Sequence, residues 1–122
     1  MCKELCSKIK ENPYVLQIFE NADLNLILLQ EKDNILIFEK RFDNSAGYIF
    51  LVCENEVNLK VFKNIYKSYA KFVKEKAKGM FKEVELVIVA RHVDNEAKRI
   101  IEDYNNVYTE RKPIIYQEVE RI

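Results

Sequence analysis

The feature that most constrains the fold is a pair of apolar, β-rich runs separated by one long amphipathic helix. Residues 48–53 (YIFLVC) are apolar at every position, which is typical of a central strand covered on both faces. Residues 84–93 (VELVIVARHV) form a second run rich in Val and Ile. A strand–helix–strand connection is right-handed and places its two strands parallel in one sheet. The sequence therefore predicts two parallel strands, at 48–54 and 84–93, joined by a helix at 58–78.

Two further strands precede this crossover. Residues 24–29 (LNLILL) and 35–38 (ILIF) are β-rich, and the polar residues 31–34 between them are typical of a hairpin turn. A second turn is expected at residues 43–47. Because short turns join neighbouring strands, we expect these two strands and the strand at 48–54 to be antiparallel.

Helical spacing of apolar residues predicts three shorter helical segments, two near the N-terminus and one after the last long strand. Near the N-terminus, Asn12-Pro13 is typical of a helix start, where Asn is the N-cap and Pro the first helical residue. After the last long strand, Asp94 is expected to cap a short helix, and residues 113–116 to add an edge strand. The apolar faces predicted for these helices are Cys2, Leu5, Cys6 and Ile9; Val15, Ile18, Phe19 and Ala22; and Ala97, Ile100, Ile101 and Tyr104.

The predicted fold class follows from this order of elements. It is an α/β protein with a mixed sheet, in which three antiparallel strands are followed by a parallel strand after a helical crossover, flanked by helices on both faces. At 122 residues the chain is expected to form a single domain, residues 1–122, around one core. The longest apolar run has six residues, so no membrane span is expected.

Composition restricts the kinds of chemistry. The first residues lack the apolar stretch of a secretory signal, and three cysteines fit a reducing compartment, so we expect a cytoplasmic protein. One histidine and three cysteines without a Cys-x-x-Cys pair are too few for a typical structural zinc site. Gly47 and Gly79 are the only glycines, which rules out a glycine-rich phosphate loop.

Charge is concentrated in one helix. Residues 60–82 carry eight lysines against a single acid, Glu75, whereas the remainder of the chain is acidic. Six of these lysines step by three or four residues, the spacing that places side chains on one helical face. They are Lys60, Lys63, Lys67, Lys71, Lys74 and Lys78. This stripe is either the solvated face of an amphipathic helix or a surface for an anion such as a nucleic-acid backbone. The single sign of its charge favours the anion, because solvated helices usually interleave Glu with Lys.

The order of elements resembles the restriction-endonuclease-like, or PD-(D/E)xK, superfamily, which includes archaeal Holliday-junction resolvases. Residues 84–105 (VELVIVARHVDNEAKRIIEDYN) resemble the strand and short capped helix that follow the catalytic motif in that family. The resemblance covers about residues 1–108. It implies a metal-dependent nuclease, in which two carboxylates hold a divalent cation such as Mg²⁺ and a lysine helps to activate the attacking water.

This sequence departs from that motif. The family needs an acid early in its second strand and Glu-x-Lys at the end of its third, where this chain has Glu54-Asn55-Glu56. Glu56 therefore stands where the lysine should be and reverses its charge. Glu39-Lys40-Arg41 is another candidate for this position, but it lies on the preceding predicted strand and fits the topology poorly.

Strand pairing suggests which residues could replace the motif. If residues 35–42 and 48–54 pair about a turn centred near Ser45, Leu36 lies opposite Glu54, and Asp33 and Asn34 approach the end of the third strand. The predicted catalytic set is then Asp33, Glu54, Glu56 and Lys60, with Asp33 and Glu54 as ligands of Mg²⁺ if the protein is active. The alternative is that these acids are solvated residues of a turn and a strand end.

Three functions remain open from the sequence. The first is a catalytically degenerate nuclease-fold protein that binds nucleic acid weakly through the basic helix. The second is an active metal-dependent nuclease, and the third is a protein-interaction module or homodimer without a nucleic-acid role. Arg91 and His92 lie at the end of a predicted strand. They are either phosphate contacts, with His92 alternatively a general base, or structural residues.

Overall fold

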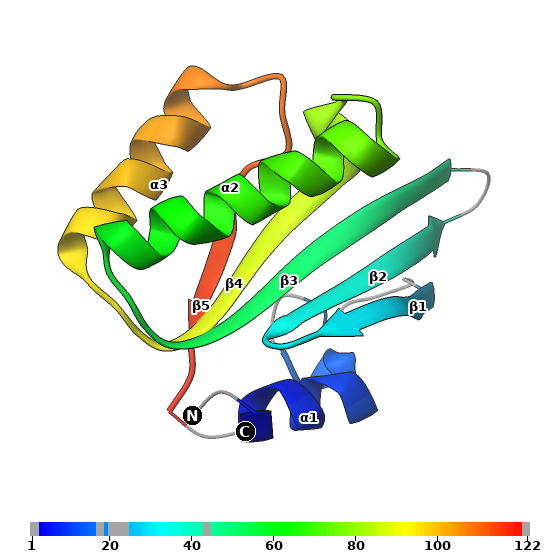
Figure 1. Ribbon diagram of the computed structural model, residues 1–122, viewed down its shortest axis with the longest axis horizontal. Helices are drawn as coiled ribbons and strands as arrows, with labels where there is room; N and C mark the ends of the chain where they lie inside the picture. The colour runs from blue at the N-terminus through cyan, green and yellow to red at the C-terminus, as the bar shows by residue number, and fades with distance from the viewer. Residues whose placement is uncertain (1–2, 17–18, 20–24, 43–44, 121–122) are drawn as a thin grey trace.

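A computed structural model describes residues 3–16, 19, 25–42 and 45–120. Five strands form one sheet in the order β1-β2-β3-β4-β5 (Figure 1). The elements run α1 (Lys3–Glu11), η1 (Pro13–Val15), β1 (Asn25–Lys32), β2 (Ile35–Phe42), β3 (Ser45–Val57), α2 (Leu59–Lys76), η3 (Phe81–Glu83), β4 (Val84–Val93), α3 (Asn95–Val107) and β5 (Ile115–Glu118). This is the order that the sequence predicts.

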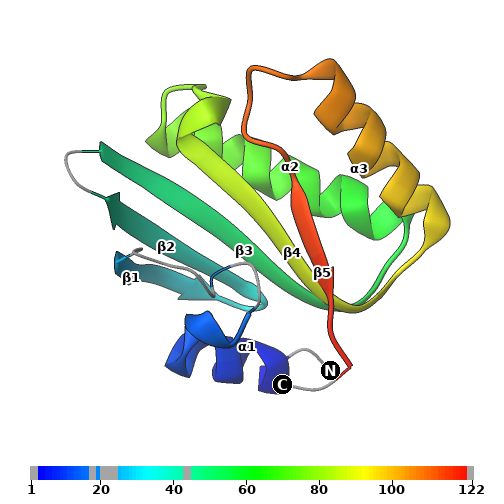
Figure 2. The same ribbon diagram turned by 180° about the vertical axis from the view of Figure 1, so that it is seen from behind.

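The sheet is mixed, as expected. The strands β1, β2 and β3 are antiparallel to one another, whereas β3, β4 and β5 are parallel. The run at residues 48–53 lies in β3, between β2 and β4, and is paired on both sides. The helix α2 provides the crossover from β3 to β4. The predicted edge strand exists as β5, and Figure 2 shows it beside β4 at the border of the sheet.

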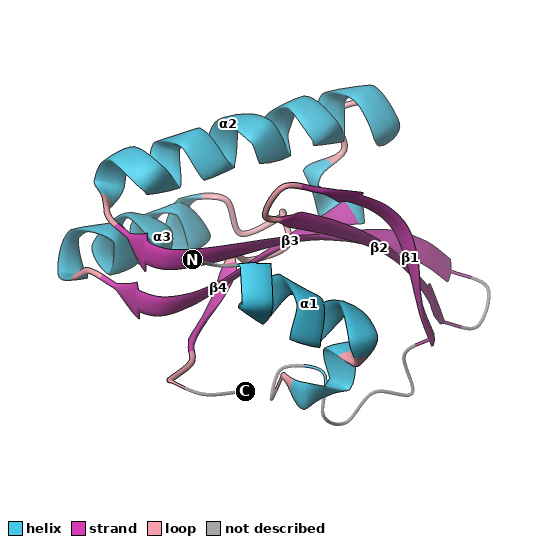
Figure 3. Ribbon diagram, turned by 60° about the horizontal axis from the view of Figure 1, so that its bottom comes forward, coloured by secondary structure: helices cyan, strands magenta, loops and turns pink. Residues whose placement is uncertain are grey.

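Helices cover both faces of the sheet. The helices α2 and α3 lie side by side on one face, and α1 lies on the other (Figures 1 and 3). Two groups of buried side chains fill the layers. The larger group joins α2 and α3 to one face of β3 and β4, and the smaller joins α1 to the opposite face. Apolar residues alternate between the two groups along β3, where Phe50 faces α2 and Leu51 faces α1.

Three local predictions are wrong or incomplete. Asn12 does cap the turn after α1, because its side chain accepts a hydrogen bond from the Tyr14 amide, but only the short 3-10 turn Pro13–Val15 follows. Val15, predicted to be buried, has 45% of its surface exposed. Ile100, predicted on the inner face of α3, is 36% exposed. Three further positions that were predicted on apolar helical faces, Cys2, Ile18 and Ala22, lie outside the described residues. Among the described residues, no helix is long and apolar enough to cross a membrane.

Candidate nucleic-acid interface

The helix α2 carries the basic surface, and its ends are set by local sequence. The Asn58 side chain accepts a hydrogen bond from the Val61 amide at 2.9 Å and so caps the N-terminus. At the other end, Lys78 and Gly79 have φ angles of 52° and 81°, which no helix can continue. Lys78 is therefore not on the helical face with the other five lysines, which corrects the predicted six-residue stripe.

Five of the six lysines of α2 form an exposed ridge on one helical face. Each is exposed, and the opposite face of the helix is buried against the sheet through residues such as Phe62, Ile65 and Tyr69. None of the five forms an ion pair with another described residue. We call this surface the basic ridge, and it comprises Lys60, Lys63, Lys67, Lys71 and Lys74. It is a row of uncompensated positive charge along most of the helix.

The tyrosines of α2 point away from the ridge, as the spacing predicts. Tyr69 is fully buried, and its hydroxyl donates a hydrogen bond to the carbonyl oxygen of Val84 at 2.8 Å. Tyr66 packs edge-to-face against Tyr104 of α3, with ring centroids 5.4 Å apart. These rings hold α2 to the rest of the molecule and are not a platform for stacking bases.

The acidic residues near the end of β3 are arranged differently from the prediction. Glu54 is half-buried, and its Oε1 accepts a hydrogen bond from the side-chain amide of Asn34. The same amide donates to the carbonyl oxygen of Cys53 at 3.0 Å, and the Cys53 amide donates to the Asn34 carbonyl at 2.9 Å. Burial raises the pKa of Glu54, and the hydrogen bond from Asn34 opposes this rise. The turn therefore brings Asn34, rather than a second carboxylate, against Glu54.

The predicted strand register is wrong by three residues. Leu36 pairs with Leu51 and not with Glu54, and Ile35 pairs with Val52. The cause is the length of the β2–β3 connection, because the strands extend to Phe42 and Ser45 and leave a shorter turn than residues 43–47.

The remaining members of the predicted catalytic set are exposed. Asp33, Glu56 and Lys60 all face solvent, and Asp33 has a φ angle of 53° in the β1–β2 turn. Glu56 lies beside His92 of the neighbouring strand β4. In the described part of the chain, no three side chains among His, Cys, Asp and Glu are placed to hold a metal ion. The catalytic roles of these residues and the Mg²⁺ site stay predictions.

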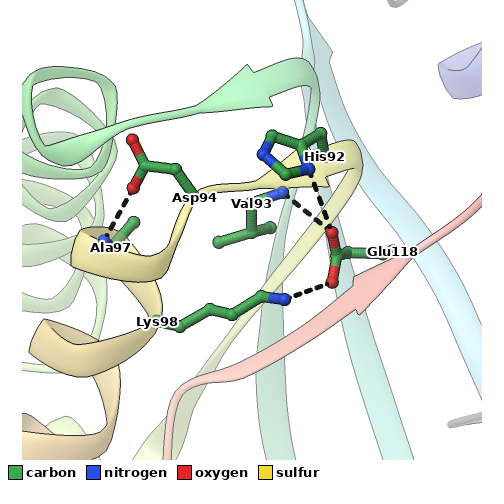
Figure 4. A network of polar contacts seen from close by, with 6 residues as sticks. All are labelled: His92, Val93, Asp94, Ala97, Lys98 and Glu118. Atoms are coloured by element: carbon green, nitrogen blue, oxygen red, sulfur yellow. Dashed lines mark hydrogen bonds and ion pairs between the residues drawn. The ribbon is translucent and has the colours of Figure 1, made fainter.

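Arg91 and His92 contact the end of β5 and the residues that follow it. Arg91 donates hydrogen bonds to the backbone carbonyls of Val119 and Glu120, the latter at 2.6 Å. His92 Nδ1 lies 3.5 Å from Glu118, whose carboxylate also receives the Val93 amide at 3.1 Å and Lys98 Nζ at 2.7 Å (Figure 4). These contacts tie the end of β4 and the start of α3 to β5. They favour the structural interpretation of both residues.

A cavity beside the basic ridge was not predicted from the sequence. It measures about 240 Å³ and lies between α2 and the neighbouring ends of β2 and β3. Its lining combines apolar and polar side chains: Asn34, Ile35, Val52, Glu54, Val61, Asn64, Ile65 and Ser68. The four lining residues from α2 follow the i, i+3, i+4, i+7 spacing of one helical face. This spacing is the only feature of the sequence that could have indicated the cavity.

Known structures with similar folds were found, although no model of a protein family and no curated protein matches the chain. EndoMS in its apo form matches over the whole chain and 47% of its own length, with 18% identity and a TM-score of 0.63. A repair endonuclease from Pyrococcus abyssi matches 96% of the chain and 46% of its own length, with 18% identity and a TM-score of 0.61. A complex of EndoMS with double-stranded DNA matches 96% of the chain and 43% of that protein, with 18% identity and a TM-score of 0.60.

These similarities define the class of fold. The chain spans less than half the length of each of these proteins, and the identity is low throughout. The fold is restriction-endonuclease-like, as the sequence predicts, with nuclease-like structural neighbours.

Proposed function

We propose that this protein binds nucleic acid through the basic ridge and does not cut it. The observation that carries the proposal is the ridge itself: five exposed lysines in a row, none paired with a described acid. Lysines in such a row bind phosphates as point charges and release the counterions condensed on the nucleic acid. Binding of this kind is weak, independent of base sequence and steeply reduced by salt.

The fold supports a nucleic-acid partner. One of the similar structures is EndoMS bound to double-stranded DNA. That complex concerns a different and longer protein, so it supports only the class of partner proposed for this chain.

We propose the absence of nuclease activity because this chain differs from the catalytic motif of the resembled family at two strand positions. The first residues of β2, where an acid is needed, are Ile35, Leu36, Ile37 and Phe38, and the last three are buried. Glu56 occupies the position of the lysine. An apolar side chain cannot hold a divalent cation, and a carboxylate cannot supply positive charge to an attacking water. The active-nuclease alternative would need Asp33, Glu54, Glu56 and Lys60 to assemble around Mg²⁺.

The test of binding compares two triple variants by fluorescence anisotropy over a range of salt concentrations. In the first, Lys63, Lys67 and Lys71 are replaced by Gln. In the matched control, three exposed bases from other surfaces, Lys8, Lys32 and Arg99, are replaced in the same way. The first variant should bind short DNA on the order of tenfold more weakly at low salt, and its salt slope should fall by about 2–3.

Two results would contradict this proposal. Equal weakening in the control variant would mean that only net charge matters, and the absence of binding by the unmodified protein at low salt would remove the nucleic-acid role. Thermal unfolding of both variants provides the fold control, because surface changes of this kind usually cost little stability.

Self-association is a second candidate, favoured by the outer side of α3. Ile100, Val107 and Tyr108 are 36%, 70% and 39% exposed, so an apolar strip faces solvent there. Sedimentation analysis of the protein and of Val107→Asp tests a homodimer or a protein partner at this surface. A monomer at all concentrations would remove the homodimer.

A further inference from the structure

The cavity beside the basic ridge has an apolar floor and a polar rim. Ile35 and Val52 come from the sheet and Val61 and Ile65 from α2, and together they provide the floor. Its volume of about 240 Å³ is below the roughly 300–1,000 Å³ of pockets for drug-sized ligands. A cavity of this size can hold one small ring system, and its polar rim can meet polar groups on the edge of such a ring.

The polar rim presents an oriented carboxylate. The Asn34 amide holds Glu54 by donating to Oε1 while it also donates to the Cys53 carbonyl. Among the described residues, no hydrogen bond reaches the second oxygen of Glu54, and that atom is not among the buried unpaired ones. Asn64 and Ser68 are exposed on the helical side of the rim and likewise have no partner in the described part of the chain. The rim is thus ready to accept hydrogen bonds from a ligand.

The helix places this rim next to the basic ridge. Asn64 is four residues after Lys60 and three before Lys67, and Ser68 is three residues before Lys71. Side chains three or four positions apart are neighbours on a helix surface. A phosphate bound by these lysines leaves its attached nucleoside within reach of the cavity.

We propose that this cavity binds one unpaired nucleobase of a single strand whose phosphates lie on the basic ridge. This inference rests on the proposed function and adds the kind of nucleic acid bound. The flat faces of a base match the apolar floor, and its edge reaches the rim. In a duplex that edge is engaged in base pairing, so the base must come from a single-stranded or opened segment.

The carboxylate makes the cavity selective. Cytosine, adenine and guanine carry amino groups that donate hydrogen bonds to a carboxylate oxygen. Thymine has no amino group, and the two carbonyl oxygens beside its single N–H would face the negative charge of Glu54. We expect a preference for cytosine over thymine, two bases of similar size.

The experiment measures binding of matched oligonucleotides, oligo(dC) and oligo(dT), of about 15 nucleotides at neutral pH and low salt. Oligo(dC) should bind about tenfold more tightly than oligo(dT), and a single strand of mixed sequence more tightly than its duplex. Replacement of Glu54 by Gln keeps the shape and an acceptor for Asn34 but allows an amide donor at the rim. The dC preference should then disappear or reverse.

An acid of α2 outside the cavity provides the matched control for Glu54. Glu75→Gln removes the same charge from an exposed position that does not line the cavity. If only long-range electrostatics operated, both variants would strengthen binding to both oligonucleotides. We expect this strengthening for Glu75→Gln alone, with its dC preference unchanged.

Each remaining outcome decides between the two proposals. Equal affinity for oligo(dC) and oligo(dT), with a ridge-dependent salt slope, would overturn the cavity and leave the ridge as the binding surface. No binding of any oligonucleotide would overturn both. Asn64→Ala, at an exposed helix position, gives a test that does not disturb Glu54, and it should weaken binding of oligo(dC) several-fold. Unchanged affinity for oligo(dC) in both Glu54→Gln and Asn64→Ala would contradict the proposal.

Discussion

Glu54 is central to both chemical interpretations of this protein, the metal site and the binding of a neutral ligand. Its carboxylate is half-buried, fixed by Asn34 and open to the cavity. A metal site needs a second carboxylate close by, and the neighbouring turn provides a neutral amide instead. The same arrangement suits hydrogen bonding to a neutral ligand, because the carboxylate is oriented and retains a free oxygen.

The first residue-scale prediction concerns cleavage. Purified protein with Mg²⁺ or Mn²⁺ should leave duplex, branched and single-stranded substrates intact, because Glu56 cannot play the cationic role of the family lysine. Gel analysis after long incubation provides the measurement. Cleavage that is abolished by Glu54→Ala would instead establish the active nuclease.

The second prediction concerns pH. Burial raises the pKa of Glu54 in the folded protein, so its ionised form costs stability at neutral pH. The folded state takes up a proton more readily than the unfolded one, and this cost is lost as the pH falls through the raised pKa. Glu54→Gln should therefore unfold at a slightly higher temperature than the unmodified protein at pH 7. The difference in unfolding temperature between the two proteins should become smaller in acid. A difference that grows as the pH falls would contradict a raised pKa of Glu54.

At the scale of elements, α2 carries both proposed binding features on adjacent faces. Its amphipathic pattern and the crossover could be predicted because each depends only on local spacing and on the handedness of strand–helix–strand units. The end of the helix was misplaced by two residues, since Lys78 continues the spacing of the lysines but has a left-handed backbone. A residue count on one face cannot reveal where the backbone leaves the helix.

The cap of α2 gives an element-scale prediction. Asn58→Ala removes the side-chain acceptor of the Val61 amide and should lower the free energy of unfolding by about 1 kcal/mol. Urea denaturation measures the change, and Asn55→Ala, an exposed residue of β3, is the control. Equal losses in the two variants would show that the cap contributes nothing specific.

At the scale of the whole molecule, the candidate site was harder to predict than the fold. The order and direction of the strands follow from apolar runs and short connections. The register of β2 on β3 depends on the length of one turn, and an error of three residues there places Leu36 opposite Glu54 instead of Leu51. The cavity joins Asn34 and Glu54 to Asn64 and Ser68, so it becomes visible only when register and helix packing are both known.

Arg111 joins separate parts of the molecule and gives the last prediction. Its guanidinium lies 3.9 Å from the ring centre of Phe81 and 4.0 Å from that of Tyr108, and it donates hydrogen bonds to the hydroxyls of Tyr66 and Tyr104. One side chain thus connects α2, η3 and the end of α3, just before the chain enters β5. A planar guanidinium can lie flat against a ring and donate hydrogen bonds from its edge at the same time, whereas a lysine ammonium has no plane that can stack.

Arg111→Lys should therefore lower the free energy of unfolding by about 1–2 kcal/mol although the charge is kept. Arg99→Lys, at an exposed position of α3, should be nearly neutral. Urea denaturation of both variants provides the comparison, and hydrogen exchange should show faster opening of the segment between α3 and β5 only in Arg111→Lys. Equal stability of the two variants would mean that charge alone, and not the stacked geometry, holds these elements together.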